Sequence, residues 1–210
     1  MIETLQVLSG ALRDVWRDVW TALVCNLLWL LAVVLIIPAG PATVALFQYT
    51  NLLARGEVTD VGDFLRAFRR HFRLGLKWGL LNGFLLFVLA GDAFLTGRLL
   101  GDSPAGRYVQ GFYLTALLFW TWLQVFALAF LFEQEQPDLR QALRNAASLF
   151  GRNILFVSVL GLLTLVTLLA GVVLFMLSGA VGGVLLALIG NHAVRLQLQP
   201  FIEQRSIAEE

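Results

Sequence analysis

The stretch Val109–Phe132 (VQGFYLTALLFWTWLQVFALAFLF) decides the fold class of this chain. It runs for 24 residues without an Asp, Glu, Lys or Arg. Because roughly 20 consecutive apolar residues cross the hydrocarbon core of a bilayer as a helix, this stretch predicts a transmembrane helix.

Similar apolar stretches occur on both sides of it. Val19–Ile37 and Ile154–Leu177 carry no charge, and Leu74–Thr96 is interrupted by Asp92 near its end. Over its 210 residues the chain is 59% hydrophobic and 14% charged, whereas soluble domains are about 25% charged. We therefore predict an all-α integral membrane protein that forms a single membrane domain over residues 1–210.

Between the apolar stretches lie short amphipathic segments. Residues 1–18 predict a helix at the membrane interface, residues 60–73 a basic elbow helix, and residues 137–152 a second elbow helix. At the start of the basic elbow, Asp60 and Asp63 suit the positive end of a helix dipole. The two elbows resemble each other at an offset of 78 residues, which aligns Asp60, Leu65, Arg66 and Phe72 with Asp138, Leu143, Arg144 and Phe150.

The rest of the chain pairs into three predicted hairpins, at residues 19–54, 74–132 and 153–199. Their turns are expected at Pro38-Ala-Gly-Pro41, at the polar link Gly97–Tyr108 and at Ser178–Gly179. Pro200 is expected to end the last helix.

Ala42–Ala54 is the uncertain crossing, because it has only 13 residues before Arg55. If it crosses, six helices place 13 basic residues inside and 2 outside; if it is re-entrant, five spans give 11 against 4. Since Lys and Arg concentrate on the cytoplasmic side, the count favours six helices. Both termini and both elbows are then cytoplasmic.

Small residues recur every four positions on two predicted helices, at Gly75, Gly79 and Gly83 and at Gly179 and Gly183. Such residues let helix backbones approach closely in a membrane. They predict packing inside the bundle, with the seam of a homo-oligomer as the alternative.

Three polar residues in or near the spans are candidates for a polar path: Asp92, Gln124 and His192. An ionisable group in the hydrocarbon suggests a pathway or a buried partner, and Arg98 or His192 are the expected partners of Asp92. The alternative is that Asp92 is solvated at the outer interface. The amides Asn26, Gln48, Asn51, Asn82 and Gln124 are explained either by hydrogen bonds between helices or by a polar substrate cavity.

No pattern in the chain predicts catalysis or a bound cofactor. It has two histidines and one cysteine, Cys25, so we expect no zinc site, and it lacks a phosphate-binding loop and a nucleophile elbow. We expect no enzyme, no cofactor and no metal. The net charge of +1 gives no reason to expect a nucleic-acid partner.

Residues 20–80 resemble the YesL family of bacterial multi-pass membrane proteins. The resemblance lies in Asn26, the run Pro38, Gly40, Pro41 and Thr43, and the later residues Arg55, Gly56, Phe64 and Phe68. An alanine stands between Pro38 and Gly40, where the family pattern has a threonine. The resemblance implies a protein of the bacterial cytoplasmic membrane, with an accessory role in carbohydrate uptake and structural roles for these residues.

Two functions follow as hypotheses. The first is a non-enzymatic accessory protein that contacts membrane lipid and either a transporter subunit or a second copy of itself. The second is a self-contained small-molecule transporter or channel, which would use the Pro38–Pro41 helix break and the membrane amides.

Overall fold

A computed structural model describes residues 2–101, 103–173 and 175–208, and side chains for residues 4–101, 103–166 and 182–198. These residues form helices and loops and no strand, which confirms the all-α prediction for this part of the chain. The helices are α1 (Ile2–Arg17), α2 (Val19–Val34), α3 (Ala39–Ala54), α4 (Val61–Arg70), α5 (Phe72–Leu100), α6 (Pro104–Leu131), α7 (Leu139–Arg152), α8 (Ile154–Val173) and α9 (Phe175–Ala208).

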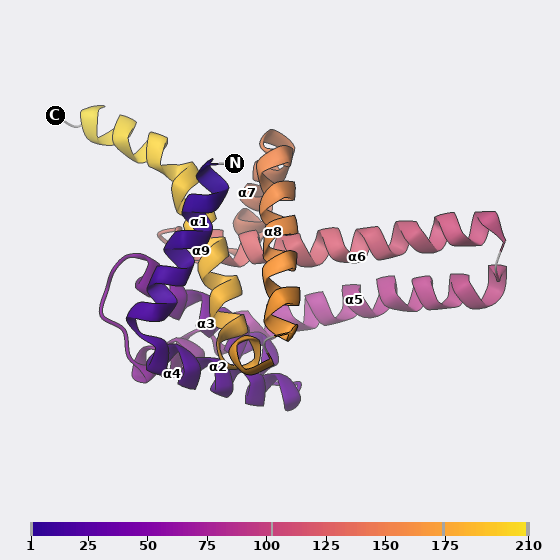
Figure 1. Ribbon diagram of the computed structural model, residues 1–210, viewed down its shortest axis with the longest axis horizontal. Coiled ribbons are helices and arrows are strands. Elements are labelled where there is room, and N and C mark those ends of the chain that lie inside the picture. The colour runs from indigo at the N-terminus through magenta and orange to yellow at the C-terminus, as the bar shows by residue number, and fades with distance from the viewer. Residues whose placement is uncertain (1, 102, 174, 209–210) are drawn as a thin grey trace.

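The order of these helices repeats a unit of three, in which one amphipathic helix comes before a pair of more apolar helices. The amphipathic helices α1, α4 and α7 precede the pairs α2–α3, α5–α6 and α8–α9. Each amphipathic helix packs against the second helix of another pair: α4 against α3, α7 against α6, and α1 against α9. The first and last helices of the chain therefore lie side by side (Figure 1).

The pair α5–α6 forms a hairpin that projects away from the other helices (Figure 1). The two helices have 29 and 28 residues. In the most apolar 18-residue stretch of α5, only 11% of the residues are buried. In the corresponding stretch of α6, 50% are buried. Most of the apolar surface of α5 therefore remains available to lipid or to other helices.

Two of the described helices, α5 and α6, are long and apolar enough to cross a membrane. The number rises to four if each bent pair is one span: α1 and α2 meet at 97°, and α7 and α8 at 101°. The six-helix bundle is therefore not confirmed. At 1.5 Å per residue the 16 residues of α2 or α3 extend about 24 Å, less than a hydrocarbon core of about 30 Å.

The first predicted turn is displaced toward the N-terminus. Residues 35–38 form the turn, and Gly40 and Pro41 already lie in the first turn of α3. A proline in the first turn of a helix costs little, because the first N–H groups have no partner within the helix. Ile36 closes the turn with a φ of 64°, a conformation that is strained for a β-branched residue.

Other predicted boundaries also move. The basic elbow ends at Arg70 rather than at residue 73, and α5 and α6 extend through most of the predicted link Gly97–Tyr108. Ser103 caps α6 by accepting a hydrogen bond from the Gly106 N–H at 3.1 Å. Ser178 and Gly179 lie within α9, so they form no turn, and α9 continues past Pro200.

The two elbow helices that the 78-residue offset relates begin with the same device. The Asp60 side chain accepts a hydrogen bond from the Asp63 N–H at 2.8 Å, and the Asp63 carboxylate accepts one from the Asp60 N–H at 3.0 Å. The Asp138 side chain caps α7 by accepting from the Arg140 N–H at 2.9 Å. Because such caps satisfy N–H groups that a helix leaves unpaired, these two residues fix where the elbows start.

α3 is the central helix, with 11 buried residues among its 16. It crosses α5 where Gly40 and Pro41 meet Gly75 and Gly79, and a Cβ at Gly79 would lie 3.0 Å from the Gly40 Cα. Gly83 contacts nothing within 4 Å of where its Cβ would be. On α9, a Cβ at Gly183 would lie 2.8 Å from the Asn26 Oδ1, whereas Gly179 lies outside the residues whose side chains are described.

The crossing of α3 and α5 predicts that alanine substitutions at two glycines of α5, Gly75 and Gly83, affect stability differently. A Cβ at Gly75 would lie 2.7 Å from the Pro41 N and overlap its Cα. We expect Gly75→Ala to lower the unfolding free energy by about 2 kcal/mol, as overpacking typically does. Gly83→Ala is the matched control and should not lower it, because alanine favours the helix by up to about 1 kcal/mol relative to glycine and the site is open. Unfolding in mixed micelles measures both, and equal losses would contradict this crossing.

Candidate functional site

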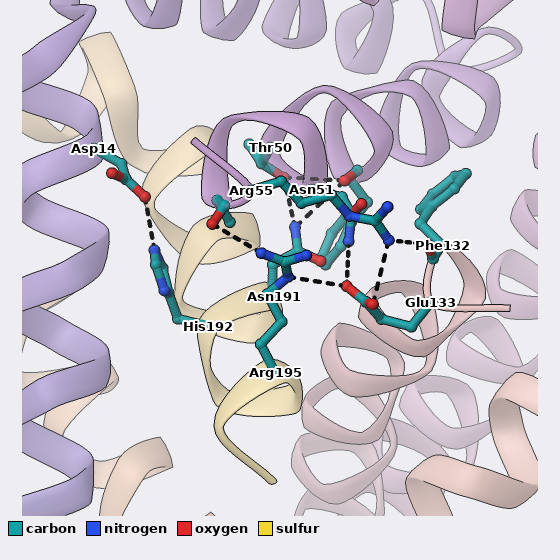
Figure 2. A network of polar contacts seen from close by, with 11 residues as sticks. Asp14, Thr50, Asn51, Arg55, Phe132, Glu133, Asn191, His192 and Arg195 are labelled. Atoms are coloured by element: carbon teal, nitrogen blue, oxygen red, sulfur yellow. Dashed lines mark hydrogen bonds and ion pairs between the residues drawn. The ribbon is translucent and has the colours of Figure 1, made fainter. Parts of the chain in front are cut away.

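A cluster of polar side chains joins the C-terminal ends of α3 and α6 to the middle of α9 (Figure 2). Glu133, just after α6, is its centre, with a side chain 14% exposed. Its carboxylate accepts hydrogen bonds from the Asn51 Nδ2 at 2.7 Å, the Arg55 Nη2 at 3.2 Å and the Arg195 Nε at 3.2 Å. One carboxylate thus binds two guanidinium groups, one from the C-terminal cap of α3 and one from α9.

The same arginines also bind backbone carbonyls at helix ends. The Arg195 Nη1 donates to the Ala54 carbonyl at 3.0 Å, and the Arg55 Nη2 donates to the Phe132 carbonyl at 3.2 Å. From α1, the Arg17 Nη2 donates to the Leu53 carbonyl at 3.0 Å. Since the last carbonyls of a helix lack partners and carry partial negative charge, these contacts stabilise the end of α3.

A second contact between α9 and α3 lies deeper in the structure. The Asn191 Nδ2 donates to the Thr50 Oγ1 at 2.9 Å and to the Phe47 carbonyl at 3.3 Å. Both Thr50 and Asn191 are fully buried. These bonds hold α9 and α3 in register one helical turn before Arg195.

His192 forms the contact between α9 and α1 (Figure 2). Its Nε2 lies 2.7 Å from the Asp14 Oδ2, and Arg17 approaches the other oxygen of Asp14 at 3.7 Å. The ring also covers Gly10, where a Cβ would lie 3.3 Å from it. α1 is therefore attached to α9 by a polar contact between Asp14 and His192, and Gly10 of α1 leaves room for the histidine ring.

At the foot of the α5–α6 hairpin, amides pair with tryptophans. The Trp78 Nε1 donates to the Gln124 Oε1 at 2.9 Å, and the Trp120 Nε1 donates to the Asn82 Oδ1 at 2.8 Å. A cavity of about 160 Å³ adjoins these residues. Asn82 and Gln124, two of the five predicted membrane amides, thus meet at one place. Gln48 does not line the cavity, and Asn26 and Asn51 form their hydrogen bonds elsewhere.

The three candidates for a polar path lie apart. Gln124 lines the cavity, and His192 contacts Asp14 on the other side of α3. Asp92 lies farther along the hairpin, and no described residue forms a hydrogen bond or ion pair with it. Its expected partner Arg98 instead lies over the Phe94 ring, 5.1 Å from the centroid.

The residues that carry the family resemblance occupy structural positions. The Asn26 Oδ1 accepts from the Gly183 N–H at 2.8 Å, and the Thr43 Oγ1 accepts from the Trp29 Nε1 at 3.0 Å. Gly56 ends α3 in a left-handed conformation, φ 78°, which glycine adopts without strain. Phe64 is buried where α4 packs on α3, and Phe68 packs edge-to-face on Phe72.

Glu133 and Asp14 were not identified from the sequence, although both turn out to be central. Glu133 is the first charge after the uncharged stretch 109–132, and a lone carboxylate at the end of a span is a usable signal. Nothing in a single sequence pairs it with Arg55, 78 residues earlier. Within the described part of the chain, no three His, Cys, Asp or Glu side chains gather as metal ligands.

His71, between α4 and α5, adds a titratable group at the elbow. Its ring packs edge-to-face on Phe132, with centroids 5.5 Å apart. Burial and the neighbouring Arg70 lower the pKa of His71 below its ordinary value of 6.5. The neutral ring is therefore the form that fits this position.

Comparison with known proteins finds a family model that matches part of the chain. The sequence model of a family described as a protein of unknown function, DUF624, matches residues 22–93, which cover α2, α3, α4 and most of α5. No curated protein and no solved structure matches the chain. The match supports an uncharacterised family for this part, whereas membership of the YesL family stays a prediction.

Removing the charge of Glu133 should weaken the contacts among α3, α6 and α9 and so lower the stability of the fold. Glu133→Gln leaves Arg55 and Arg195 facing each other without a counter-charge, and we expect a loss of about 2 kcal/mol in unfolding free energy. Glu135→Gln, at an exposed neighbour, is the control and should have almost no effect. Unfolding in mixed micelles at low and high salt measures this, and equal effects of the two variants would refute the role given to Glu133.

His71 predicts a pH-dependent contribution to stability. Because its pKa is lowered on folding, the unfolded chain binds more protons as pH falls through 6.5, so acidification destabilises the fold. We expect wild type to lose more stability than His71→Phe between pH 7.5 and 5.5. Unfolding midpoints at the two pH values measure the difference, and an identical loss in both proteins would contradict the prediction.

Proposed function

We propose that the chain is a non-enzymatic, multi-pass protein of the bacterial cytoplasmic membrane that assists carbohydrate uptake through contacts with a transporter subunit. The projecting α5–α6 hairpin carries the proposal. It exposes large apolar side chains along its length, among them Phe84, Phe87, Phe112 and Leu118. In a bilayer such a surface is available to the helices of a partner, whose packing depends on close contact between helices.

The contacts of the charged cluster favour a structural role over a catalytic one. Three donors surround the Glu133 carboxylate, which leaves it little capacity to act as a general base. The arginines and Asn191 are likewise engaged with backbone or side-chain partners. The cluster holds α3, α6 and α9 together and so supports the base from which the hairpin projects.

The arrangement also favours an accessory protein over a transporter. A transport path needs polar groups that follow one another across the membrane. Asp92, Gln124 and His192 lie in different parts of the structure, and the cavity beside Gln124 measures about 160 Å³. The carbohydrate part of the proposal depends on the resemblance to the YesL family.

The proposed orientation has the elbows and both termini in the cytoplasm. The distribution of Lys and Arg supports this, and so does the position of α4, whose Arg69 and Arg70 are exposed beside the first residues of α5. The tip of the hairpin, near Gly101 and Ser103, would then face outward.

The contact proposal can be tested by photo-crosslinking in living cells. A photoreactive amino acid at Phe87 or Phe112 should form an adduct with a membrane subunit of a carbohydrate-uptake system, identified by mass spectrometry. The same group at Val58, a fully exposed position in the loop before α4, should not. Deletion of the gene should also lower carbohydrate uptake several-fold, and Phe87→Arg should reproduce part of that loss.

Two results would overturn the proposal. Adducts only with a second copy of the chain, together with unchanged uptake in the deletion strain, would indicate a homo-oligomer without this role. Saturable sugar flux into liposomes that contain only the folded protein would establish the transporter instead.

A further inference from the structure

A row of exposed side chains on α5 changes from basic to apolar along the helix. Its members are Arg73, Lys77, Leu80, Phe84 and Phe87. Because they are spaced alternately by four and three residues, they share one face of the helix. The opposite face is packed, since Gly75 meets α3 and Asn82 binds Trp120 of α6. This row, the α5 outer row, therefore faces away from the other helices.

The basic end of the row belongs to a group of cations without acidic partners. Four exposed cations at the α4–α5 elbow form no ion pair with any described residue: Arg69, Arg70, Arg73 and Lys77. The cation before them, Arg66, is bound by Asp60 and Asp63. Glu133, just after α6, is already bound by two arginines. The elbow thus carries positive charge that the described side chains leave unbalanced.

The spacing of the row matches the layers of a membrane. α5 is long and apolar enough to cross one. At 1.5 Å per residue, Arg73 and Lys77 lie about 6 Å apart along the axis, and the headgroup layer of one leaflet is roughly 5 to 8 Å thick. Leu80 and Phe84 follow about 5 and 10 Å beyond Lys77, at the depth of acyl chains. Cations and apolar side chains therefore stand in the order in which a phospholipid presents its phosphate and its chains.

We propose that the α5 outer row binds one anionic phospholipid, with its phosphate between Arg73 and Lys77 and its chains on Leu80 and Phe84. A lipid with net negative charge balances the elbow, whereas a zwitterionic lipid brings a cation of its own. A water-soluble acidic protein segment could meet the cations, but it would leave the apolar part of the row uncovered. The site is independent of the proposed contact with a transporter subunit, for which Phe87 remains available.

Native mass spectrometry of the full-length protein in a neutral detergent measures the binding. The lipids are dioleoyl-phosphatidylglycerol and dioleoyl-phosphatidylcholine, which share their acyl chains and differ in net charge. Because each cation near an anionic membrane surface contributes about fivefold in binding, we expect the first phosphatidylglycerol to bind about tenfold more tightly than the first phosphatidylcholine. Glycerol 3-phosphate at equal concentration should not compete, because it lacks the chains that lie on Leu80 and Phe84.

Three double variants locate the site. Arg73→Gln/Lys77→Gln should lower the preference for phosphatidylglycerol to about twofold or less. Arg140→Gln/Arg144→Gln is the matched control and should keep the preference, because it removes two exposed cations of equal spacing from a polar surface of α7. Leu80→Ser/Phe84→Ser should weaken both lipids several-fold and leave the preference unchanged. All six positions are exposed, and size-exclusion profiles with helical circular dichroism confirm that each variant is folded.

Three results would overturn the proposal. An equal loss of preference in the α5 and α7 cation variants would mean that overall charge, and not this row, selects the lipid. Equal binding of the two lipids to folded wild type would leave the elbow cations to an acidic protein segment. Competition by glycerol 3-phosphate would indicate a site for a soluble anion.

Discussion

The close approach of α3 and α5 is the constraint on which the rest of the structure depends. Gly40 and Gly75 bring the two backbones into contact, and α3 is buried over most of its length. With α5 held at this crossing, the hairpin can project only from that side of α3, and its foot must lie next to Thr43 and Phe47. The cavity and its paired tryptophans follow from that position.

At the other end of α3 the constraint is electrostatic. Three arginines from different segments reach the carbonyls or the carboxylate near its last turn. Their charges would repel one another without Glu133, which lies between Arg55 and Arg195. Since these groups are partly shielded from water, the attraction is stronger than that of an exposed ion pair. One helix is thus fixed at its start by small residues and at its end by charge.

Part of this arrangement could be predicted from local patterns. The helical class, the elbows and the position of Asp60 and Asp63 at a helix start follow from apolar periodicity and from the preference of acids for that end of a helix. The turn at Pro38–Pro41 was misplaced because proline is compatible with the first turn of a helix as well as with a loop. The contacts of Glu133 and of His192 could not be predicted, because they join residues 62 to 178 positions apart. Periodicity shows which face of a helix is apolar. It does not show which helix packs against that face.

The packing of α1 against α9 has a consequence for how the chain is made. The ribosome makes α1 well before the part of α9 that receives it, since His192 lies 178 positions after Asp14. Of the helices made soon after it, α1 contacts α2 and α3. Until α9 has been made, the apolar face of α1 must lie elsewhere, and an amphipathic helix lies favourably in the membrane interface. Docking of α1 is then a late step of assembly, because Asp14 can meet His192 only after α9 has been made.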